Sequence, residues 1–438
     1  MGVEKLISDV RLSSVVPATI TGDDKVHEFT NTDLIMKLHY IKCLYFFKND
    51  VVEGLDIHDL KKPMFQLLEL YYHASGRIRR SGGGDDGGRP FIKCNDSGVR
   101  IVEAKCRNKT IDEWLAMFMN DASVNEELVY DQVLGPDLGF APLLFIQFTW
   151  FKCGGMSIGL SWAHVLGDAF SASNFLNIWA QIMAGQLPPQ FLKKPTITNK
   201  FINSPLLLSP VERLPFFIKR VDPVGDHWKL TNTCKMQSHS FHITQKQLNQ
   251  LIFKGCGTKV KPFDAICATV WKILAKVRGK YSSEPNIVTI IRRDDKSCDR
   301  KTTEVSSNGQ VISIIEANNV IVSEADTSKL AKLIAEKVVN ETRVVEDLMK
   351  KENGTSDFVV YGANLTFVNL EEAKIYDLEV RGKKPIFASY NISGVGDEGV
   401  VLVLPGPKNL NGKEGGRIVN VILPEDQIEG LKNEMREA

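Results

Sequence analysis

The residues in this sequence whose types and spacing best suit chemistry are His164 and Asp168, four positions apart. A histidine can act as a general base because its unperturbed pKa, about 6.5, lies close to neutral pH. Asp168 could orient the imidazole ring, or it could fix the loop by pairing with a distant arginine. A His-x-x-x-Asp spacing also occurs by chance, so the alternative is a buried structural histidine bonded to a main-chain carbonyl.

Two predicted strands lead into His164. Residues 145–151 alternate between apolar and polar-capable side chains and are rich in aromatic and β-branched types, which predicts a strand. After two glycines, a second apolar run extends to Trp162. His164 should therefore lie just past a strand end, where rigid scaffolds commonly present reactive groups, and residues 169–179 are predicted to form the next helix.

The bulk composition narrows the class of protein. The chain has 438 residues and is 43% hydrophobic, so it can bury a sizeable core in one or two domains. Its formal net charge of +1 gives no reason to expect nucleic acid or a strongly charged partner. The 8 cysteines are scattered without a Cys-x-x-Cys pair, which argues against a zinc site and a disulfide scaffold and suits a reducing compartment.

No targeting or membrane-spanning segment is expected. Glu4, Asp9 and Arg11 lie among the first residues, which therefore lack the apolar core of a signal peptide. No stretch approaches the ~18 uninterrupted apolar residues typical of a membrane helix. Any membrane role would have to work through a bound partner, and without one the protein is expected to be cytoplasmic.

The composition also divides the chain into two halves. Residues 193–223 are rich in Pro, Ser and Asn and show no sustained hydrophobic periodicity, which is typical of a linker. We therefore predict a first domain of residues 1–192 and a second of residues 224–438, both of mixed α/β class. The expected strands are 10–19, 91–94, 99–104, 145–151, 235–243, 286–291, 311–316, 358–360, 365–368, 400–404 and 417–423. The expected helices are 59–73, 111–118, 169–179, 244–254, 263–277, 327–350 and 425–435.

One helix start has a specific local signal. Thr244 and Gln247 have the spacing of a capping box, in which the two side chains bond each other's main-chain N–H groups. This predicts that the helix 244–254 begins at Thr244.

The block around His164 resembles the His-x-x-x-Asp block of the plant BAHD acyltransferases, which use acyl-coenzyme A. The similarity covers nearly the whole chain, which makes it far more specific than the short motif. It is carried by residues 75–77, 142–144, 151–155, 168–171, 179–180, 262–265 and 271–272, and by Arg278.

Further segments resemble one BAHD subgroup, the Eceriferum or Glossy type, linked in plants to making very-long-chain acyl groups for surface wax. They are residues 10–18, 36–40, 133–138 and 361–370. The resemblance implies two chloramphenicol-acetyltransferase-like domains with mixed sheets, joined by a crossover loop near 193–223. It also implies acyl-CoA as a substrate or ligand, and no resident cofactor or metal.

The same resemblance suggests a partner for Asp168. Arg293 closes the strand 288–291 at the place where the family has an arginine that pairs with this aspartate. A guanidinium suits a buried two-point contact with a carboxylate, which would make Asp168 structural. The alternative is a solvated run of charges, since residues 294–296 are also charged.

Two other sets of residues bear on activity. If the chain is an enzyme, Asn364 or Thr366 could bind substrate and stabilise the oxyanion. Active family members carry an Asp-Phe-Gly-Trp-Gly block near the C-terminus, and we match it to the stretch around Gly394, Val395 and Gly396. Both glycines are kept, but Val395 stands where Trp is expected and cannot fill the same volume.

Two functions from different classes follow. The first is an accessory protein that supports elongation of very-long-chain acyl-CoAs with the condensing enzyme (ketoacyl-CoA synthase) of the fatty-acid elongase. It would act at the cytosolic face of the endoplasmic reticulum and as a monomer. The second is an acyl-CoA-dependent O- or N-acyltransferase with His164 as general base. The altered Gly394–Val395–Gly396 block favours the first, and the intact His164 and Asp168 favour the second.

Overall fold

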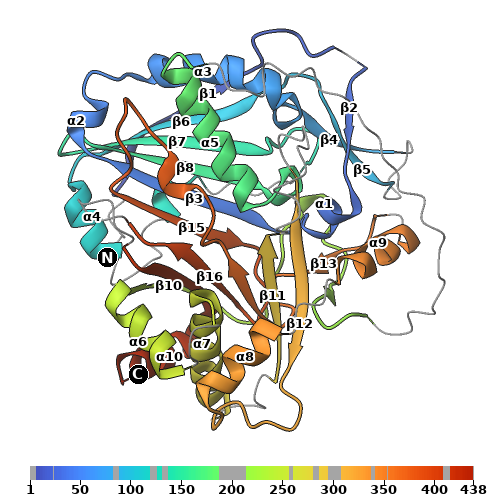
Figure 1. Cartoon of the computed structure of the whole chain (residues 1–438). Coiled ribbons are helices and arrows are strands. Elements are labelled where there is room, and N and C mark those ends of the chain that lie inside the picture. The colour runs from blue at the N-terminus through green and yellow to red at the C-terminus, as the bar shows by residue number, and fades with distance from the viewer. Residues whose placement is uncertain are drawn as a thin grey trace, which may run out of the picture.

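The fold consists of two helix-covered halves, each built on a mixed sheet of six strands (Figure 1). The computed structural model describes residues 6–22, 24–81, 88–118, 126–130, 137–186, 214–255, 260–279, 286–293, 307–336, 341–352, 354–407 and 415–437. Most of the predicted linker, up to residue 213, lies outside these residues. Among the described residues, no helix is long and apolar enough to cross a membrane.

The first sheet has the order β1-β6-β7-β8-β3-β15. Its strands are β1 (Ser8–Val15), β6 (Val99–Cys106), β7 (Leu144–Phe151), β8 (Met156–Ala163), β3 (Tyr40–Phe47) and β15 (Phe387–Ser393). Only the β6–β7 pair is parallel among these described strands. Every residue of β3 and β8 is buried, as expected for central strands covered on both faces.

The second sheet has the order β10-β17-β16-β14-β11-β12. Its strands are β10 (Met236–Ile243), β17 (Arg417–Pro424), β16 (Val400–Pro405), β14 (Leu365–Asn369), β11 (Ile287–Arg293) and β12 (Gln310–Glu316). β14 pairs in parallel with both β11 and β16, and the other described pairs are antiparallel. Small sheets join β2 (Val26–Glu28), β5 (Pro90–Lys93) and β4 (Arg77–Arg80), and β9 (Lys219–Arg220) with β13 (Phe358–Val359).

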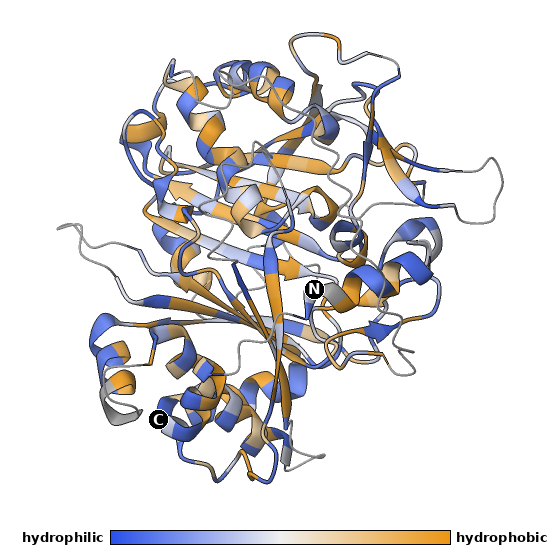
Figure 2. Cartoon of the chain, turned by 45° about the vertical axis from the view of Figure 1, so that its right-hand side comes forward, coloured by the Kyte–Doolittle hydropathy of each residue, from blue (hydrophilic) through white to orange (hydrophobic). Residues whose placement is uncertain are grey.

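Helices cover the outer faces of the two sheets (Figure 1). The first half contains α1 (Asn31–Ile35), α2 (Asn49–Val52), α3 (Ile57–Leu70), α4 (Ile111–Phe118) and α5 (Ala169–Met183). The second contains α6 (Gln245–Gly255), α7 (Pro262–Gly279), α8 (Thr327–Glu336), α9 (Thr342–Lys351) and α10 (Glu425–Glu437). The helices carry both hydrophilic and hydrophobic residues, whereas the central strands are largely hydrophobic (Figure 2). The apolar residues of the helices pack with the sheets to form the core.

Several elements differ from the sequence-based expectation, among them the central strand β3, and two of the differences lie in the second half of the chain. No strand was predicted at β15, yet it pairs with β3 across seven residues, so part of the predicted second domain completes the first sheet. The single helix predicted for 327–350 is instead two helices, α8 and α9, with residues 337–340 outside the described part. The N–H of Glu341 donates to the carbonyl of Ile312 on β12 (2.9 Å), which ties the start of α9 to the sheet rather than to α8.

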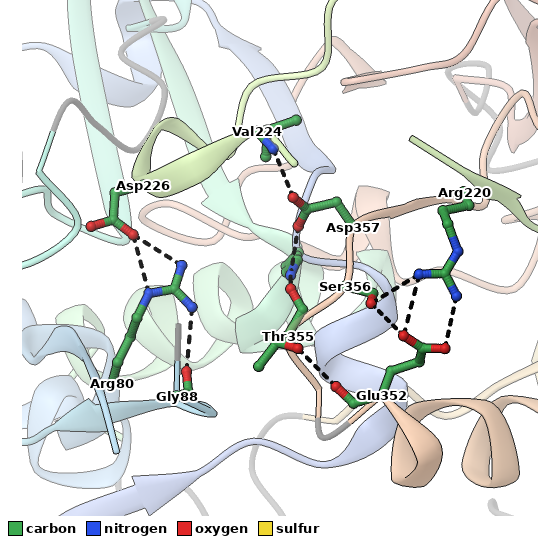
Figure 3. A network of polar contacts seen from close by, with 10 residues as sticks. Arg80, Gly88, Arg220, Val224, Asp226, Glu352, Thr355, Ser356 and Asp357 are labelled. Atoms are coloured by element: carbon green, nitrogen blue, oxygen red, sulfur yellow. Dashed lines mark hydrogen bonds and ion pairs between the residues drawn. The ribbon is translucent and has the colours of Figure 1, made fainter. Parts of the chain in front are cut away.

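The described end of the crossover segment is fastened to both halves by ion pairs (Figure 3). Arg220 pairs with Glu352 just after α9 (2.8 Å), and Arg80 of β4 pairs with Asp226 (2.9 Å). These four side chains are partly exposed, so each pair should contribute little to stability on its own, about 0–1 kcal/mol.

A buried ion pair involves Asp357, which Figure 3 shows between the two exposed pairs. Lys37 Nζ and Asp357 Oδ1 are 2.6 Å apart, and their side chains are only 1% and 8% exposed. Asp357 also accepts the N–H of Val224 (2.7 Å), and Lys37 donates to the carbonyl of Thr355 (3.1 Å). Lys37 precedes β3, so this pair links the first half to the second half and to the residue that directly follows the crossover segment.

Candidate active site

The loop that carries His164 is shaped by its immediate neighbours. β8 ends at Ala163, and residues His164–Leu166 form one short 3-10 turn. Gly167 follows with φ +136, a conformation that residues with a side chain rarely adopt. A Cβ at Gly167 would also lie 2.8 Å from the Cβ of Ser171, so the turn requires glycine. The turn directs Asp168 to the start of α5.

Asp168 is the N-cap of α5. Its carboxylate accepts the N–H of Ser171 (3.0 Å), which satisfies a main-chain donor that the first helical turn leaves free. Burial raises the pKa of Asp168, and the hydrogen bond from Ser171 opposes that shift. The role of Asp168 in this geometry is to begin the helix that follows His164.

The ion pair expected between Arg293 and Asp168 is not formed within the described part of the chain. Arg293 instead lies over the ring of Phe170 (4.9 Å), close enough for its charge to lower the pKa of Asp168. Its neighbour Arg292 pairs with Asp264 of α7 (2.5 Å). Successive side chains on a strand point to opposite faces, so only one of the two arginines can face α7. Arg293 faces α5, beside Asp168, without reaching its carboxylate.

Asp168→Ala should therefore lower the free energy of unfolding by about 0.5–2 kcal/mol, the usual cost of losing an N-cap. This is less than the ~3–5 kcal/mol typical of breaking a buried ion pair. Urea denaturation of wild type and variant would measure the difference. Arg293→Met is the control and should change stability by less than Asp168→Ala; an equal and large loss in both variants would restore the ion-pair interpretation.

The second half holds the His164 loop from the other side. The N–H of Asp168 donates to the carbonyl of Ser307 (3.2 Å), and the Ser171 hydroxyl donates to the same oxygen (3.0 Å). Asn308 donates to the main-chain carbonyl of His164 (3.0 Å) and to Asp33 (2.7 Å). The loop is thus fixed between residues that are more than a hundred positions apart in the sequence.

The imidazole of His164 is buried and contacts a tyrosine. His164 is 1% exposed, and its Nε2 lies 3.0 Å from the hydroxyl oxygen of Tyr361. That hydroxyl also donates to Gln310 Oε1 (3.0 Å). Burial lowers the pKa of His164 to about 4, so its ring is neutral at physiological pH, as a general base must be.

A small cavity lies beside His164, between the two sheets. Its walls combine apolar side chains with a few polar ones from both halves. They are Ile41, His164, Ala169, Gln310, Tyr361, Val368, Leu370, Tyr390, Asn391, Ile392 and Leu402. His164 therefore lies between the two halves, beside a small and largely apolar space.

A larger cleft adjoins this cavity at Asn391. It is lined by residues of β3, β15, β10 and β17 together with Phe118, Glu126 and Val129. Asn391 borders both spaces, so the cleft and the His164 cavity are neighbours.

His39 is a second buried histidine next to the first. The ring centres of His39 and His164 are 6.4 Å apart, and His39 is 0% exposed. Its Nε2 accepts the N–H of Val360 (3.2 Å), and burial lowers its pKa to about 3. These contacts and its complete burial suit a structural role for His39.

Asn364 and Thr366 do not border the His164 cavity. The Thr366 hydroxyl donates to the carbonyl of Asn364 (2.9 Å) and accepts the N–H of Gly362 (3.2 Å). Asn364 accepts a hydrogen bond from Thr289 (2.6 Å) and donates to Phe216 (3.0 Å). Since a threonine hydroxyl has one proton to donate, Thr366 has none left for an oxyanion in this arrangement.

The Gly394–Val395–Gly396 stretch touches the segments that hold the two histidines. Gly394 has φ +79, and a Cβ there would lie 2.0 Å from the carbonyl oxygen of Leu38. The N–H of Gly396 donates to the carbonyl of Tyr361 (2.9 Å). Val395 is 3% exposed and belongs to the main core. This stretch therefore supports both His39 and Tyr361 by close main-chain packing.

Sequence reasoning missed Tyr361 and Gln310. Tyr361 was noted only within a segment of resemblance, and Gln310 borders a predicted strand without any motif. No local pattern could have placed them, because Tyr361 lies 197 positions from His164. For metals, the described residues contain no group of three or more His, Cys, Asp or Glu side chains that could hold an ion.

Solved structures show which class of protein this architecture defines. Vinorine synthase matches with a TM-score of 0.70 at 17% identity, over 97% of this chain and 96% of that one. TRI101 of F. graminearum, complexed with coenzyme A and deoxynivalenol, matches with a TM-score of 0.71 at 14% identity, over 93% and 97%. The two chloramphenicol-acetyltransferase-like domains with mixed sheets expected from the sequence are thereby confirmed.

Sequence comparison identifies the family. The model described as Transferase family matches residues 9–438. Protein ECERIFERUM 2 of Arabidopsis thaliana is 43% identical over 442 residues, 98% of each chain, and Protein ECERIFERUM 26-like of the same plant is 40% identical over 427 residues, 97% of this chain and 94% of the other. The chain belongs to this transferase family, the plant BAHD acyltransferases, and to their Eceriferum type.

Proposed function

We propose that this protein binds acyl-CoA and supports the elongation of very-long-chain acyl-CoAs for cuticular wax. It would act as a monomer with the ketoacyl-CoA synthase of the fatty-acid elongase, at the cytosolic face of the endoplasmic reticulum. The observation that carries this proposal is the near-full-length similarity to ECERIFERUM 2. A membrane helix of its own is not needed, because association with the elongase would bring the protein to that membrane.

The cavity and the adjoining cleft support acyl-CoA as the ligand. Ile41, Val368 and Leu402 give the His164 cavity apolar walls for the part of an acyl chain next to the thioester. Polar residues also line the cleft at Asn391, among them Ser240 and Asn420, whose side chains bond each other (2.6 Å). No metal or resident cofactor is part of the proposal; acyl-CoA is ligand or substrate.

The alternative is acyl-CoA-dependent transfer to a hydroxyl or amine with His164 as general base. It is supported by the neutral His164 beside the cavity and by Asp168, which fixes the loop. Two observations weigh against it: the contact of Tyr361 with His164 Nε2, and the internal hydrogen bond of the proposed oxyanion donor Thr366. The valine at position 395 points the same way.

His164→Ala should leave most of the chain-lengthening effect intact if the accessory role is right. An essential base would cost a factor of about 10²–10⁴ when removed, whereas a binding role loses one polar contact. The test expresses wild type or His164→Ala beside a ketoacyl-CoA synthase in a host that lacks wax-length lipids, and compares the longest acyl chains by gas chromatography.

The matched control is His242→Ala, which removes an exposed histidine on β10. Equal amounts of folded protein must be verified for all three chains. Loss of the longest chains in the His164→Ala strain alone would overturn the accessory role and favour the transferase.

A further inference from the structure

The hydroxyl of Tyr361 occupies the place of a substrate hydroxyl. Its oxygen lies 3.0 Å from His164 Nε2, within the ~2.6–3.2 Å reach of a general base. Because its one proton is donated to Gln310, the hydroxyl accepts the N–H of Nε2. Both side chains border the same cavity. A covalently attached hydroxyl therefore stands where an external acceptor would have to bind.

Tyr361 is held in this position from several sides. Its hydroxyl donates to Gln310 (3.0 Å), and its carbonyl accepts the N–H of Gly396 (2.9 Å). Its ring packs edge-on against His39, with ring centres 4.8 Å apart, and it is 1% exposed. Moving the phenol away would break these contacts and leave Gln310 without its partner, so the ring is expected to stay in place.

We infer that Tyr361 keeps His164 from acting on an external acceptor, so that the chain holds an acyl-CoA without transferring its acyl group. The inference rests on the acyl-CoA binding proposed above. Two oxygen atoms cannot share one position beside Nε2, so an acceptor is excluded while the phenol is there. Burial also raises the pKa of Tyr361, which disfavours the phenolate and makes the phenol itself a poor acceptor.

Removing the hydroxyl should release a latent activity. Tyr361→Phe keeps the ring but frees a polar site about the size of a water molecule between His164 and Gln310. A water there would attack the thioester carbonyl carbon while its proton passes to His164 Nε2. The carbon–sulfur bond breaks, His164 returns the proton to the sulfur, and the products are a fatty acid and the free thiol of CoA.

The experiment measures CoA thiol release from stearoyl-CoA by the purified full chain, using a thiol-reactive dye. Binding is measured separately by calorimetry, with a thioether analogue of stearoyl-CoA that cannot be cleaved. Wild type should bind the analogue and release thiol no faster than buffer. Tyr361→Phe should release thiol about 10²–10⁴-fold faster than wild type, the usual contribution of a general base.

Three further variants make the result specific. Adding His164→Ala to Tyr361→Phe should return the rate to that of wild type. Tyr376→Phe is the matched control, since its buried hydroxyl contacts the main chain of Ala388 and no histidine. If Tyr361→Phe does not fold, Tyr361→Leu opens more space and should form a methyl ester when methanol is supplied.

The outcomes separate this inference from the proposed function. Binding of the analogue without faster release in either folded Tyr361 variant would overturn the inference alone. If wild type released CoA thiol as fast as Tyr361→Phe, the inference alone would also be overturned. No binding of the analogue by wild type would overturn both the inference and the acyl-CoA-binding role.

Discussion

Asp357→Asn is expected to lower the free energy of unfolding by about 3–5 kcal/mol, because it leaves the Lys37 ammonium buried without its counterion. Lys37 is 1% exposed and lies 2.6 Å from Asp357, so water cannot replace the lost carboxylate without opening the core. The hydrogen bond from Lys37 to the carbonyl of Thr355 remains and offsets only part of the loss. Differential scanning fluorimetry and urea denaturation would measure the effect.

The loss of stability caused by Asp357→Asn should become smaller as the pH rises. Burial lowers the pKa of Lys37, and the charge of Asp357 opposes that shift, so the variant's Lys37 should have a still lower pKa. Between that folded-state pKa and the unfolded value of about 10.4, the unfolded chain binds more protons, and stability therefore rises with pH. The difference between wild type and Asp357→Asn should narrow as pH rises from about 7 toward about 10.

Asp226→Ala is the matched control for this prediction. Its ion pair with Arg80 lies in the same network (Figure 3), but the aspartate side chain is 52% exposed. We expect a loss of about 0–1 kcal/mol, without a comparable pH trend. Equal losses for Asp226→Ala and Asp357→Asn would show that the burial of Lys37 and Asp357 does not decide the energetics.

Gly394→Ala is the second substitution from which we expect a large loss of stability. At φ +79 an alanine is strained by about 1–3 kcal/mol, and its Cβ would also lie 2.0 Å from the carbonyl oxygen of Leu38. Main-chain atoms must move to remove that overlap, and Leu38 immediately precedes His39. We expect a loss of stability well above the strain alone, together with an altered environment for His164.

Gly382→Ala is the control that separates backbone strain from steric overlap. Gly382 also has a positive φ, +73, but no atom lies within 4 Å of the position of its Cβ. The strain is thus shared by the two variants, and the steric overlap is present only in Gly394→Ala. The difference in urea midpoint between them reports the overlap, and equal midpoints would argue that the Leu38 segment can move at little cost.

Local features of the fold were determined by the sequence alone. The Thr244–Gln247 capping box forms as predicted, with both reciprocal hydrogen bonds present. The helix predicted for 111–118 has those bounds. His164 follows a strand, as the apolar run before it indicated. Hydrophobic period and capping act between residues a few positions apart, so a short window of sequence contains all the information they need.

The tertiary structure alone decided the chemistry of the site. Only folding brings Tyr361 to His164, places Arg293 over Phe170 rather than on Asp168, and adds β15 to the first sheet. These contacts join segments more than a hundred positions apart, and their free energy depends on burial and packing that no local pattern records. The sequence could therefore indicate which histidine to examine. The contact of Tyr361 with Nε2 of that histidine followed from the packing of the two halves.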